Sequence, residues 1–150
     1  MSSSESVSVA RLLDAAVEWA DGSDVDPLVI SALPGYYHLV AASDIEQRTP
    51  AELTEAVASH VDLARDRPIG TVAVRVRAAD RDEDDWPTGR TVIEIVTDDM
   101  PFLVDSVSAA LTAGGHTIRL VIHPVLMVVR DAAGHLVGLC RRRLLRLAGR

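Results

Sequence analysis

The sequence contains no lysine and no asparagine, and all 15 of its basic residues are arginine. A single cysteine, Cys140, excludes an intramolecular disulfide and indicates a reducing compartment. Aromatic residues make up only 3% of the chain, so valine, leucine, isoleucine and alanine must build the core. No apolar run is long enough to span a bilayer, and the first residues lack the pattern of a signal peptide. We therefore expect a soluble, cytoplasmic protein that does not bind membranes.

The remaining composition is that of a globular chain, with 48% hydrophobic and 25% charged residues over 150 positions. The formal net charge is −7, yet five arginines fall within residues 141–150. Residues 1–140 hold all 22 acidic and 10 of the basic groups, which opposes binding to a phosphate backbone. The composition thus predicts an acidic domain with an Arg-rich tail, and no nucleic-acid partner.

The first half of the chain has helical periodicity. Apolar residues over 6–20 recur at the spacing of an amphipathic helix, which ends at the sequence Asp-Gly-Ser. Asp26 before Pro27 predicts an N-cap and a short helix over 27–32, which the Pro-Gly at 34–35 should interrupt. Thr49, Pro50 and Glu52 form the pattern of a capping box, and that helix should run to about Arg65. Residues 1–67 are therefore predicted to be a helical N-terminal segment.

From residue 70 the period changes to that of strands. Val72, Val74 and Val76 alternate with arginine and alanine, which predicts a strand with one buried face. An acidic run at 80–85 reads as a solvated loop, and a turn at 86–89 leads to a strand over 91–96. That strand is apolar on both faces, which favours a central position. A helix follows, with Leu103 at the start of its apolar face and two glycines after it.

Further strands are expected over 118–122, after which His123-Pro124 should interrupt the ladder, then over 125–129 and 135–140, with a hairpin turn at 131–134. The strand over 91–96 should lie parallel to the one over 118–122, through a right-handed crossover. This order opens a ferredoxin-like topology. We predict an α+β fold in which residues 70–140 form a partial βαββ module, with a sheet edge that another copy or further protein would cover.

Residues 92–107 read VIEIVTDDMPFLVDSV, and residues 118–124 read IRLVIHP. These two stretches resemble the N-terminal region of the large NAD-specific glutamate dehydrogenases of bacteria. The paired tyrosines at 36–37, the helix start at 48–53, the Arg-Pro at 67–68 and the strand at 72–76 stand in the family's order. The resemblance covers roughly residues 30–140, and the contiguous run at 98–106 is specific. It implies that 70–140 is an incomplete ACT-like regulatory module.

The resemblance also implies a parent enzyme that converts L-glutamate to 2-oxoglutarate and ammonia with NAD. None of its catalytic machinery is expected in these 150 residues. The sequence has no Gly-x-Gly-x-x-Gly after a strand, and it lacks the lysines that glutamate dehydrogenases use at the substrate. We predict no catalytic, cofactor-binding or metal-binding residue here, and we expect NAD in a downstream domain of the parent.

The predicted site is the loop between the strand over 91–96 and the following helix. Its candidate residues, for contact with an effector or a neighbouring subunit, are Asp98, Asp99, Met100, Pro101, Phe102 and Asp105. The simpler interpretation is that Asp98 or Asp99 caps the helix. ACT modules carry a glycine where this chain has Phe102, which disfavours close approach of a ligand to the backbone and favours a packing or subunit-contact role. As the only phenylalanine, Phe102 is expected in the core.

Other chemistry has weak support. His116 and His123 should point to opposite faces of a strand, and no cluster has zinc spacing. Ser106 lacks the nucleophile elbow, and Cys140 is expected to fill apolar space. The expected partners are the downstream domains of the parent, other copies of the chain and an amino-acid effector. A free-standing ACT-like amino-acid-binding protein is the alternative. The chain could be an excised fragment, a truncated reading frame or a short paralogue.

Overall fold

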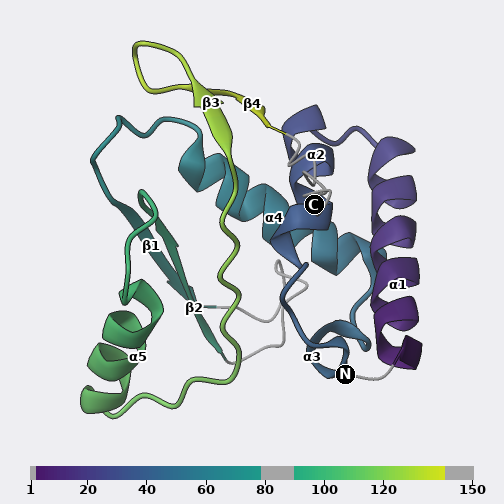
Figure 1. Ribbon diagram of the computed structural model, residues 1–150, viewed down its shortest axis with the longest axis horizontal. Helices are drawn as coiled ribbons and strands as arrows, with labels where there is room; N and C mark the ends of the chain where they lie inside the picture. Colours follow the sequence, from purple (N-terminus) through teal and green to yellow (C-terminus); the bar gives the residue numbers. More distant parts are fainter. Residues whose placement is uncertain (1–2, 79–89, 141–150) are drawn as a thin grey trace, which may run out of the picture.

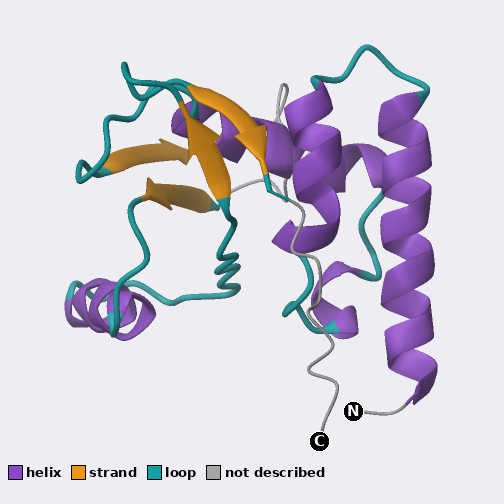
Figure 2. Cartoon of the chain, turned by 45° about the horizontal axis from the view of Figure 1, so that its top comes forward, coloured by secondary structure: helices purple, strands orange, loops and turns teal. Residues whose placement is uncertain are grey.

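The computed structural model describes residues 3–78 and 90–140. Three predicted features lie outside those residues: the acidic loop at 80–85, the turn at 86–89 and the Arg-rich tail at 141–150. Helices and two small antiparallel sheets form an α+β structure, which confirms the predicted class. Figures 1 and 2 show α1, α2 and α4 gathered in one half of the molecule, with the β1–β2 hairpin and α5 in the other.

Four helices form the first half of the chain: α1 (Ser3–Asp21), α2 (Pro27–Tyr36), α3 (Ala42–Ile45) and α4 (Pro50–Ala64). Both predicted starts are confirmed. The Asp26 carboxylate accepts from the backbone N–H of Leu28, and Thr49 and Glu52 complete a reciprocal capping box. None of the helices in the described residues is long and apolar enough to cross a membrane.

The prediction that α2 ends before Pro34 is wrong, because the helix continues through the proline to Tyr36. Proline removes only one helical hydrogen bond this close to the end. Burial of the next residues holds the last turn in place. Tyr36 and Tyr37 are both buried, and the Tyr37 hydroxyl donates to the Leu53 carbonyl oxygen at 2.9 Å.

The core lies between α1, α2 and α4, where small and branched side chains interlock. Its fully buried members include Ala16, Ala20, Leu33 and Val57, and Leu136 of the last strand joins the same cluster. A buried leucine contributes roughly 1.5–3 kcal/mol by removal from water. The helical half therefore supplies most of the stability, and the last strand is attached to it.

Strands β1 (Ala73–Ala78) and β2 (Thr91–Val96) form an antiparallel hairpin in which Val74 pairs with Ile95. The prediction that the valine face of β1 is buried is wrong, since Val72, Val74 and Val76 are all more than half exposed. The strand instead turns its arginines toward α4. A predicted central position for β2 is also wrong, because its described sheet has only these two strands.

A polar cluster explains this orientation. Arg75 donates through Nε to Glu94 at 2.7 Å and through Nη1 to Asp62 at 3.1 Å. Its Nη2 donates to the hydroxyl of Ser59 at 2.9 Å and also to the Ser59 carbonyl. Because Ser59 and Asp62 are on α4, the strand face that carries Arg75 satisfies these groups, whereas a valine face would leave them unpaired.

Helix α5 (Leu103–Ala113) forms as predicted, but none of its side chains is fully buried. The following strand prediction, over 118–122 and parallel to β2, is wrong: in the described residues the sheets are β1–β2 and β3–β4 only. Residues 118–127 run along the helical half instead. Leu120 lines a cavity of about 10 Å³ with Tyr37 and Ile45, and Leu126 packs near Gly35.

The predicted C-terminal hairpin is confirmed. Strands β3 (Val128–Arg130) and β4 (Leu136–Leu139) pair antiparallel, with an irregular register between Val129 and Arg130. The Asp131 carboxylate accepts from the backbone N–H groups of Ala133 and His135, both at 2.9 Å, and so holds the turn.

Candidate functional site

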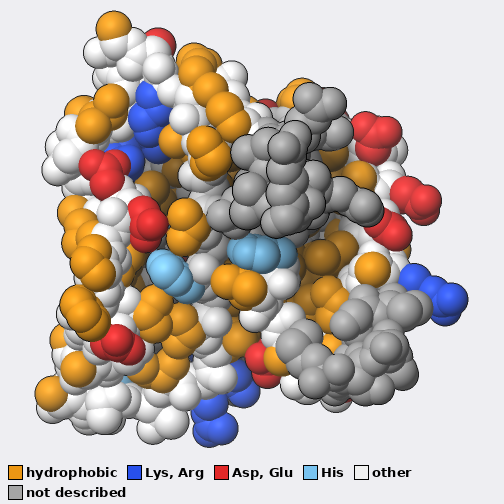
Figure 3. All heavy atoms as spheres, in the orientation of Figure 1, with side chains coloured by type: hydrophobic (Ala, Val, Ile, Leu, Met, Phe, Trp, Pro, Cys, Tyr) orange, Lys and Arg blue, Asp and Glu red, His pale blue; other side chains and the backbone are white. Residues whose placement is uncertain are grey.

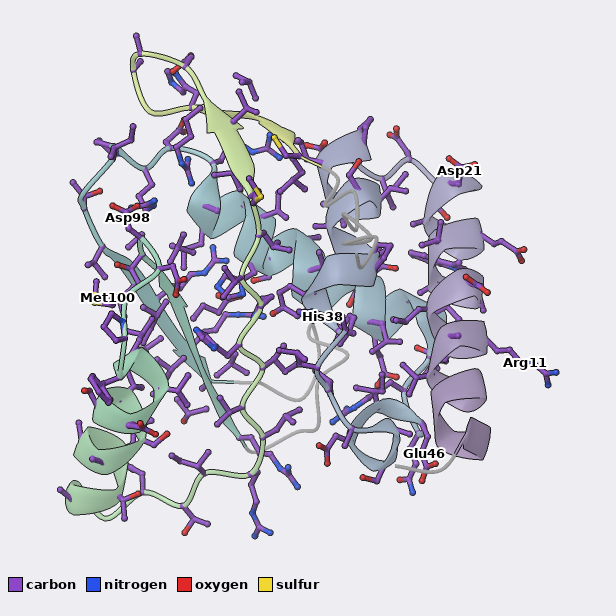
Figure 4. The ribbon with its side chains drawn as sticks, in the orientation of Figure 1. Arg11, Asp21, His38, Glu46, Asp98 and Met100 are labelled. Atoms are coloured by element: carbon purple, nitrogen blue, oxygen red, sulfur yellow. The ribbon has the colours of Figure 1, made fainter. Side chains whose placement is uncertain are left out.

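The six predicted site residues lie on the surface at the link between β2 and α5. Asp98, Asp99, Met100, Pro101, Phe102 and Asp105 are all exposed. Figure 4 labels Asp98 and Met100 on this link, at the edge of the molecule far from α1. The loop is therefore accessible to a ligand or a neighbouring protein, and it is not a closed pocket.

Asp98 does not cap α5, contrary to the simpler interpretation. Its Oδ1 accepts from Nη2 of Arg67 at 2.6 Å, and its Oδ2 accepts from the backbone N–H of Gly70 at 3.0 Å. The hydrogen bond from Arg67 lowers the pKa of the Asp98 carboxyl. Desolvation opposes this shift, and the bond from Gly70 adds to it. Asp98 thus ties the loop to the segment after α4.

Phe102 takes the N-cap position of α5 with a left-handed backbone, at φ 62° and ψ 12°. The predicted core position of this side chain is wrong, since it is 76% exposed. No side chain caps the helix, and the Phe102 carbonyl accepts from the Ser106 N–H at 2.9 Å. An exposed phenylalanine in a conformation that suits glycine has no evident packing role in this fold.

Arg67 is the buried partner in this arrangement, with 5% of its surface exposed. Its Nη1 donates to the Thr71 carbonyl at 2.6 Å, and its backbone N–H donates to the Gly134 carbonyl at 3.3 Å. One residue therefore joins the loop at Asp98, the link before β1 and the turn between β3 and β4.

A second arginine reinforces this junction from the hairpin side. Nη1 of Arg130 donates to the carbonyls of Ala64 at 2.7 Å and Gly134 at 2.9 Å. Burial lowers the pKa of Arg130, and the neighbouring Arg67 guanidinium lowers it further. Gly134 has φ 93°, and a Cβ there would lie 2.9 Å from backbone atoms of Pro68, so the turn sits directly against the chain after α4.

Sequence reasoning treated Arg67 only as part of a helix break and did not single out Arg130. Arg67 lies 31 residues from Asp98, and Arg130 lies 66 residues from Ala64. No local pattern reports a contact over such separations. The Arg-Pro at 67–68 is visible in the sequence, but it shows neither the burial of the arginine nor its partner.

A further polar group links α2, α4 and β2. The Tyr36 hydroxyl lies 3.0 Å from Nδ1 of His60, and Nε2 of His60 lies 3.2 Å from the Ile95 carbonyl oxygen. Since a carbonyl only accepts, Nε2 carries the proton and Nδ1 accepts from Tyr36. Burial raises the pKa of the Tyr36 hydroxyl, so it stays a donor.

The remaining candidates are dispersed. His38, His116, His123 and His135 are exposed, and residues 3–78 and 90–140 contain no group of three or more His, Cys, Asp or Glu that could hold a metal ion. Cys140 is exposed, so its predicted role as apolar filler is wrong. A hollow of about 330 Å³ lies away from the loop, between α1, α2 and α4, and is lined by residues that include Trp19, Asp26 and Arg65.

The strand-to-helix turn does not fit a dinucleotide. In the part of the chain that the structure describes, β2 is followed by a helix whose N-terminal region carries the carboxylates of Asp98, Asp99 and Asp105. These charges oppose a pyrophosphate, and Phe102 stands where a glycine would allow close approach. We therefore assign no step of NAD chemistry to these residues.

Comparison with known proteins matches residues 33–146 to the family described as glutamate dehydrogenase, ACT1 domain. An NAD-specific glutamate dehydrogenase of Pseudomonas aeruginosa is 31% identical over 119 residues, which are 77% of this chain and 7% of that protein. The enzyme of the same name from Halomonas elongata is 33% identical over 96 residues, 64% of this chain and 6% of that protein. No solved structure matches.

This chain thus spans less than a tenth of the length of the curated relatives it matches. The matched range begins inside α2 and includes the loop at Asp98 and both sheets. The chain belongs to the family of the glutamate dehydrogenase ACT1 domain and corresponds to an N-terminal region of NAD-specific glutamate dehydrogenases.

Proposed function

We propose that this chain is the regulatory and subunit-contact portion of a large NAD-specific glutamate dehydrogenase, and that it catalyses nothing by itself. The parent would deaminate L-glutamate to 2-oxoglutarate and ammonia, reducing NAD in a downstream domain. The match of residues 33–146 to the ACT1 domain carries this proposal, together with the names of the two relatives. A cytoplasmic location belongs to the same proposal.

The Asp98–Arg67 pair supports a regulatory role, because it connects the exposed loop to the segment that follows α4. An amino acid that binds at residues 98–102 would alter the environment of Asp98, whose partner Arg67 also contacts the β3–β4 turn through Gly134. A ligand that favours one arrangement of this junction would shift the population of the whole module. Downstream domains that prefer one arrangement would then respond, and so would the distant active site.

The first test is to identify the native polypeptide that carries these residues, by peptide mapping of extracts from the source cells after separation by size. We expect the peptides to migrate with a long chain that reduces NAD in the presence of glutamate. Peptides that migrate near 16.1 kDa, the mass of the 150 residues, would favour the alternative of a free-standing amino-acid-binding protein. A saturable rise in melting temperature with one amino acid would then support that alternative.

The second test addresses regulation in the long enzyme. Asp98→Asn removes the charge that pairs with Arg67, while Asp21→Asn removes an exposed carboxylate on α1, outside the loop, and serves as the matched control. We expect Asp98→Asn to change the concentration of amino acid that gives half-maximal activation or inhibition, with the glutamate KM unchanged. Identical effector curves for both variants and the wild type would contradict a regulatory role for this loop.

A further inference from the structure

The hollow between α1, α2 and α4 combines one open aromatic ring with aliphatic side chains. Its volume of about 330 Å³ is at the lower end of the range for small-molecule sites, which is about 300–1,000 Å³. Trp19 of α1 lines the hollow and is 40% exposed. Val25, Val29 and Ala58 also line it and are buried or partly buried. The hollow therefore offers an indole ring and an apolar lining to a small ligand.

The charged residues that line the hollow are mostly acidic. Three of them are the carboxylates Asp24, Asp26 and Glu55, and the fourth is the guanidinium of Arg65, so the lining has a net charge of −2. Nη2 of Arg65 donates to Asp26 at 2.7 Å, so these two charges offset each other. The exposed side chain of Asp24 makes no hydrogen bond or ion pair with the residues that the structure describes. The hollow therefore favours a ligand of positive charge.

The end of α1 makes the surroundings of the hollow more negative. The C-terminal end of a helix carries a partial negative charge, which a basic residue in the last turn commonly offsets. Helix α1 has no basic residue in its last turn, but it has Glu18 and Asp21 there. Acidic side chains gather over this part of α1 in Figure 3, and Figure 4 labels Asp21 at its end. These charges add to the attraction for a cation.

An inorganic cation does not match this arrangement. Mg²⁺ and Ca²⁺ require several oxygen ligands that converge on one point. The described residues contain no group of three or more His, Cys, Asp or Glu that could hold a metal ion. An organic cation can instead place methylene groups on the apolar lining and an ammonium group over the ring of Trp19. The lining charge of −2 matches two such ammonium groups.

We propose that the hollow binds a protonated aliphatic diamine, the simplest member of the polyamine class. Asp24 and the ring of Trp19 hold one ammonium group, and the second lies toward α4, where Glu55 adds negative charge. The methylene chain covers the apolar lining between them. A bound diamine thus joins α1 and the α1–α2 link to α4. This site lies apart from the loop at residues 98–102, so it does not rest on the regulatory role proposed for that loop.

The test is a fluorescence titration of the purified 150-residue chain with butane-1,4-diamine at constant ionic strength. Trp86→Phe leaves Trp19 as the only tryptophan, because the chain contains two. We expect a saturable change in Trp19 emission. The diamine should bind about two- to fivefold more tightly than butylamine, because its second ammonium group gains one exposed ion pair. Mg²⁺ at the same concentration should cause no saturable change.

Matched variants locate the site. Asp24→Asn removes the carboxylate that has no partner among the described residues, and it should weaken diamine binding about two- to fivefold. Asp14→Asn is the control, because Asp14 is an exposed carboxylate of α1 that does not line the hollow. Trp19→Leu keeps an apolar side chain but removes the cation–π contact, and calorimetric titration should show weaker binding. Thermal melts without ligand check that each variant is folded.

Three results would overturn the proposal. The first is the absence of a saturable signal up to the highest usable concentration of diamine. The second is an equal signal with Mg²⁺, which would show that charge alone is recognised. The third is equal affinity of the diamine for Asp24→Asn and Asp14→Asn, because general attraction to an acidic surface would then account for the binding.

Discussion

Oδ1 of Asp98 lies 2.6 Å from Nη2 of Arg67, so an exposed carboxylate after β2 pairs with a buried guanidinium after α4. Among the described residues, no other ion pair joins these two segments. Through the Gly134 carbonyl, the same arginine reaches the β3–β4 turn. The loop that the sequence marks for effector or subunit contact is therefore attached to the rest of the fold at a defined point.

Loss of the Arg67 guanidinium should destabilise the fold. Arg67→Met keeps the apolar stem but leaves Asp98 and the Thr71 carbonyl without their donor. We expect the free energy of unfolding to fall by about 2–3 kcal/mol in urea titrations at neutral pH. Arg11→Met, which replaces an exposed arginine on α1, is the control and should be nearly silent. Equal stability of the two variants would rule out a structural role for the Arg67 contacts.

The Asp98 pair should also give stability a specific pH dependence. Because the pKa of Asp98 is lowered below its ordinary 3.8 in the folded state, its contribution is complete above that value. It is lost as the pH falls through the folded pKa. The melting temperature of the wild type should therefore exceed that of Asp98→Asn at neutral pH, and the two should converge in acid. If the difference between the two melting temperatures does not shrink below pH 3.8, the Asp98–Arg67 pair does not stabilise the fold.

Phe102→Gly should stabilise the fold, because the left-handed conformation at φ 62° strains a phenylalanine and suits glycine. After the greater chain entropy of glycine in the unfolded state is subtracted, we expect a gain of about 0.5–1 kcal/mol. Phe102→Ala removes the same exposed ring without relieving the backbone, so it should bring no gain. Urea titrations of both variants measure the two free energies of unfolding. An alanine variant as stable as the glycine variant would show that the backbone at Phe102 is not strained.

Gly134→Ala and Gly115→Ala form a matched pair, since both glycines have positive φ, at 93° and 81°. A Cβ at Gly134 would lie 2.9 Å from Pro68 backbone atoms, whereas nothing lies within 4 Å at Gly115. We expect Gly134→Ala to cost about 2–4 kcal/mol and Gly115→Ala about 1 kcal/mol. Thermal melts should separate them clearly. Similar costs would mean that the hairpin does not sit against Pro68.

The His60 ring should be protonated at Nε2 and bare at Nδ1, because Nε2 faces the Ile95 carbonyl oxygen. Two-dimensional NMR of the ring nitrogens at neutral pH reads this directly. Tyr36→Phe deletes the donor to Nδ1 and should cost about 1 kcal/mol of stability. An Nδ1–H tautomer in the wild type would show that His60 donates to the Tyr36 hydroxyl instead of accepting from it.

Features that depend on neighbouring residues in the chain could be predicted. The cap at Asp26, the box formed by Thr49 and Glu52, and the turn at 131–134 are short-range hydrogen-bond patterns, and the structure contains each of them. Helix α5 follows from its apolar period and its glycines. The boundaries at residues 67 and 70 of the proposed segments stay predictions, since the core includes residues on both sides.

The sequence-based predictions were wrong where a residue distant in the chain determined how a side chain is placed. Alternation in β1 identifies two faces, but only Ser59 and Asp62 on α4 make the arginine face the inner one. Capping was the local expectation for Asp98, and Arg67 competes for it more strongly as a charged donor.

The sequence by itself determined the α+β class, the helix starts, the hairpin turn and the family resemblance, because each rests on side chains a few positions apart. Only the tertiary structure decided that Arg67 holds Asp98, that Phe102 is exposed, and that residues 118–126 lie on the helical half without a backbone hydrogen bond to other described residues. Those outcomes depend on which buried or charged groups meet across the fold, and a one-dimensional pattern does not specify such meetings.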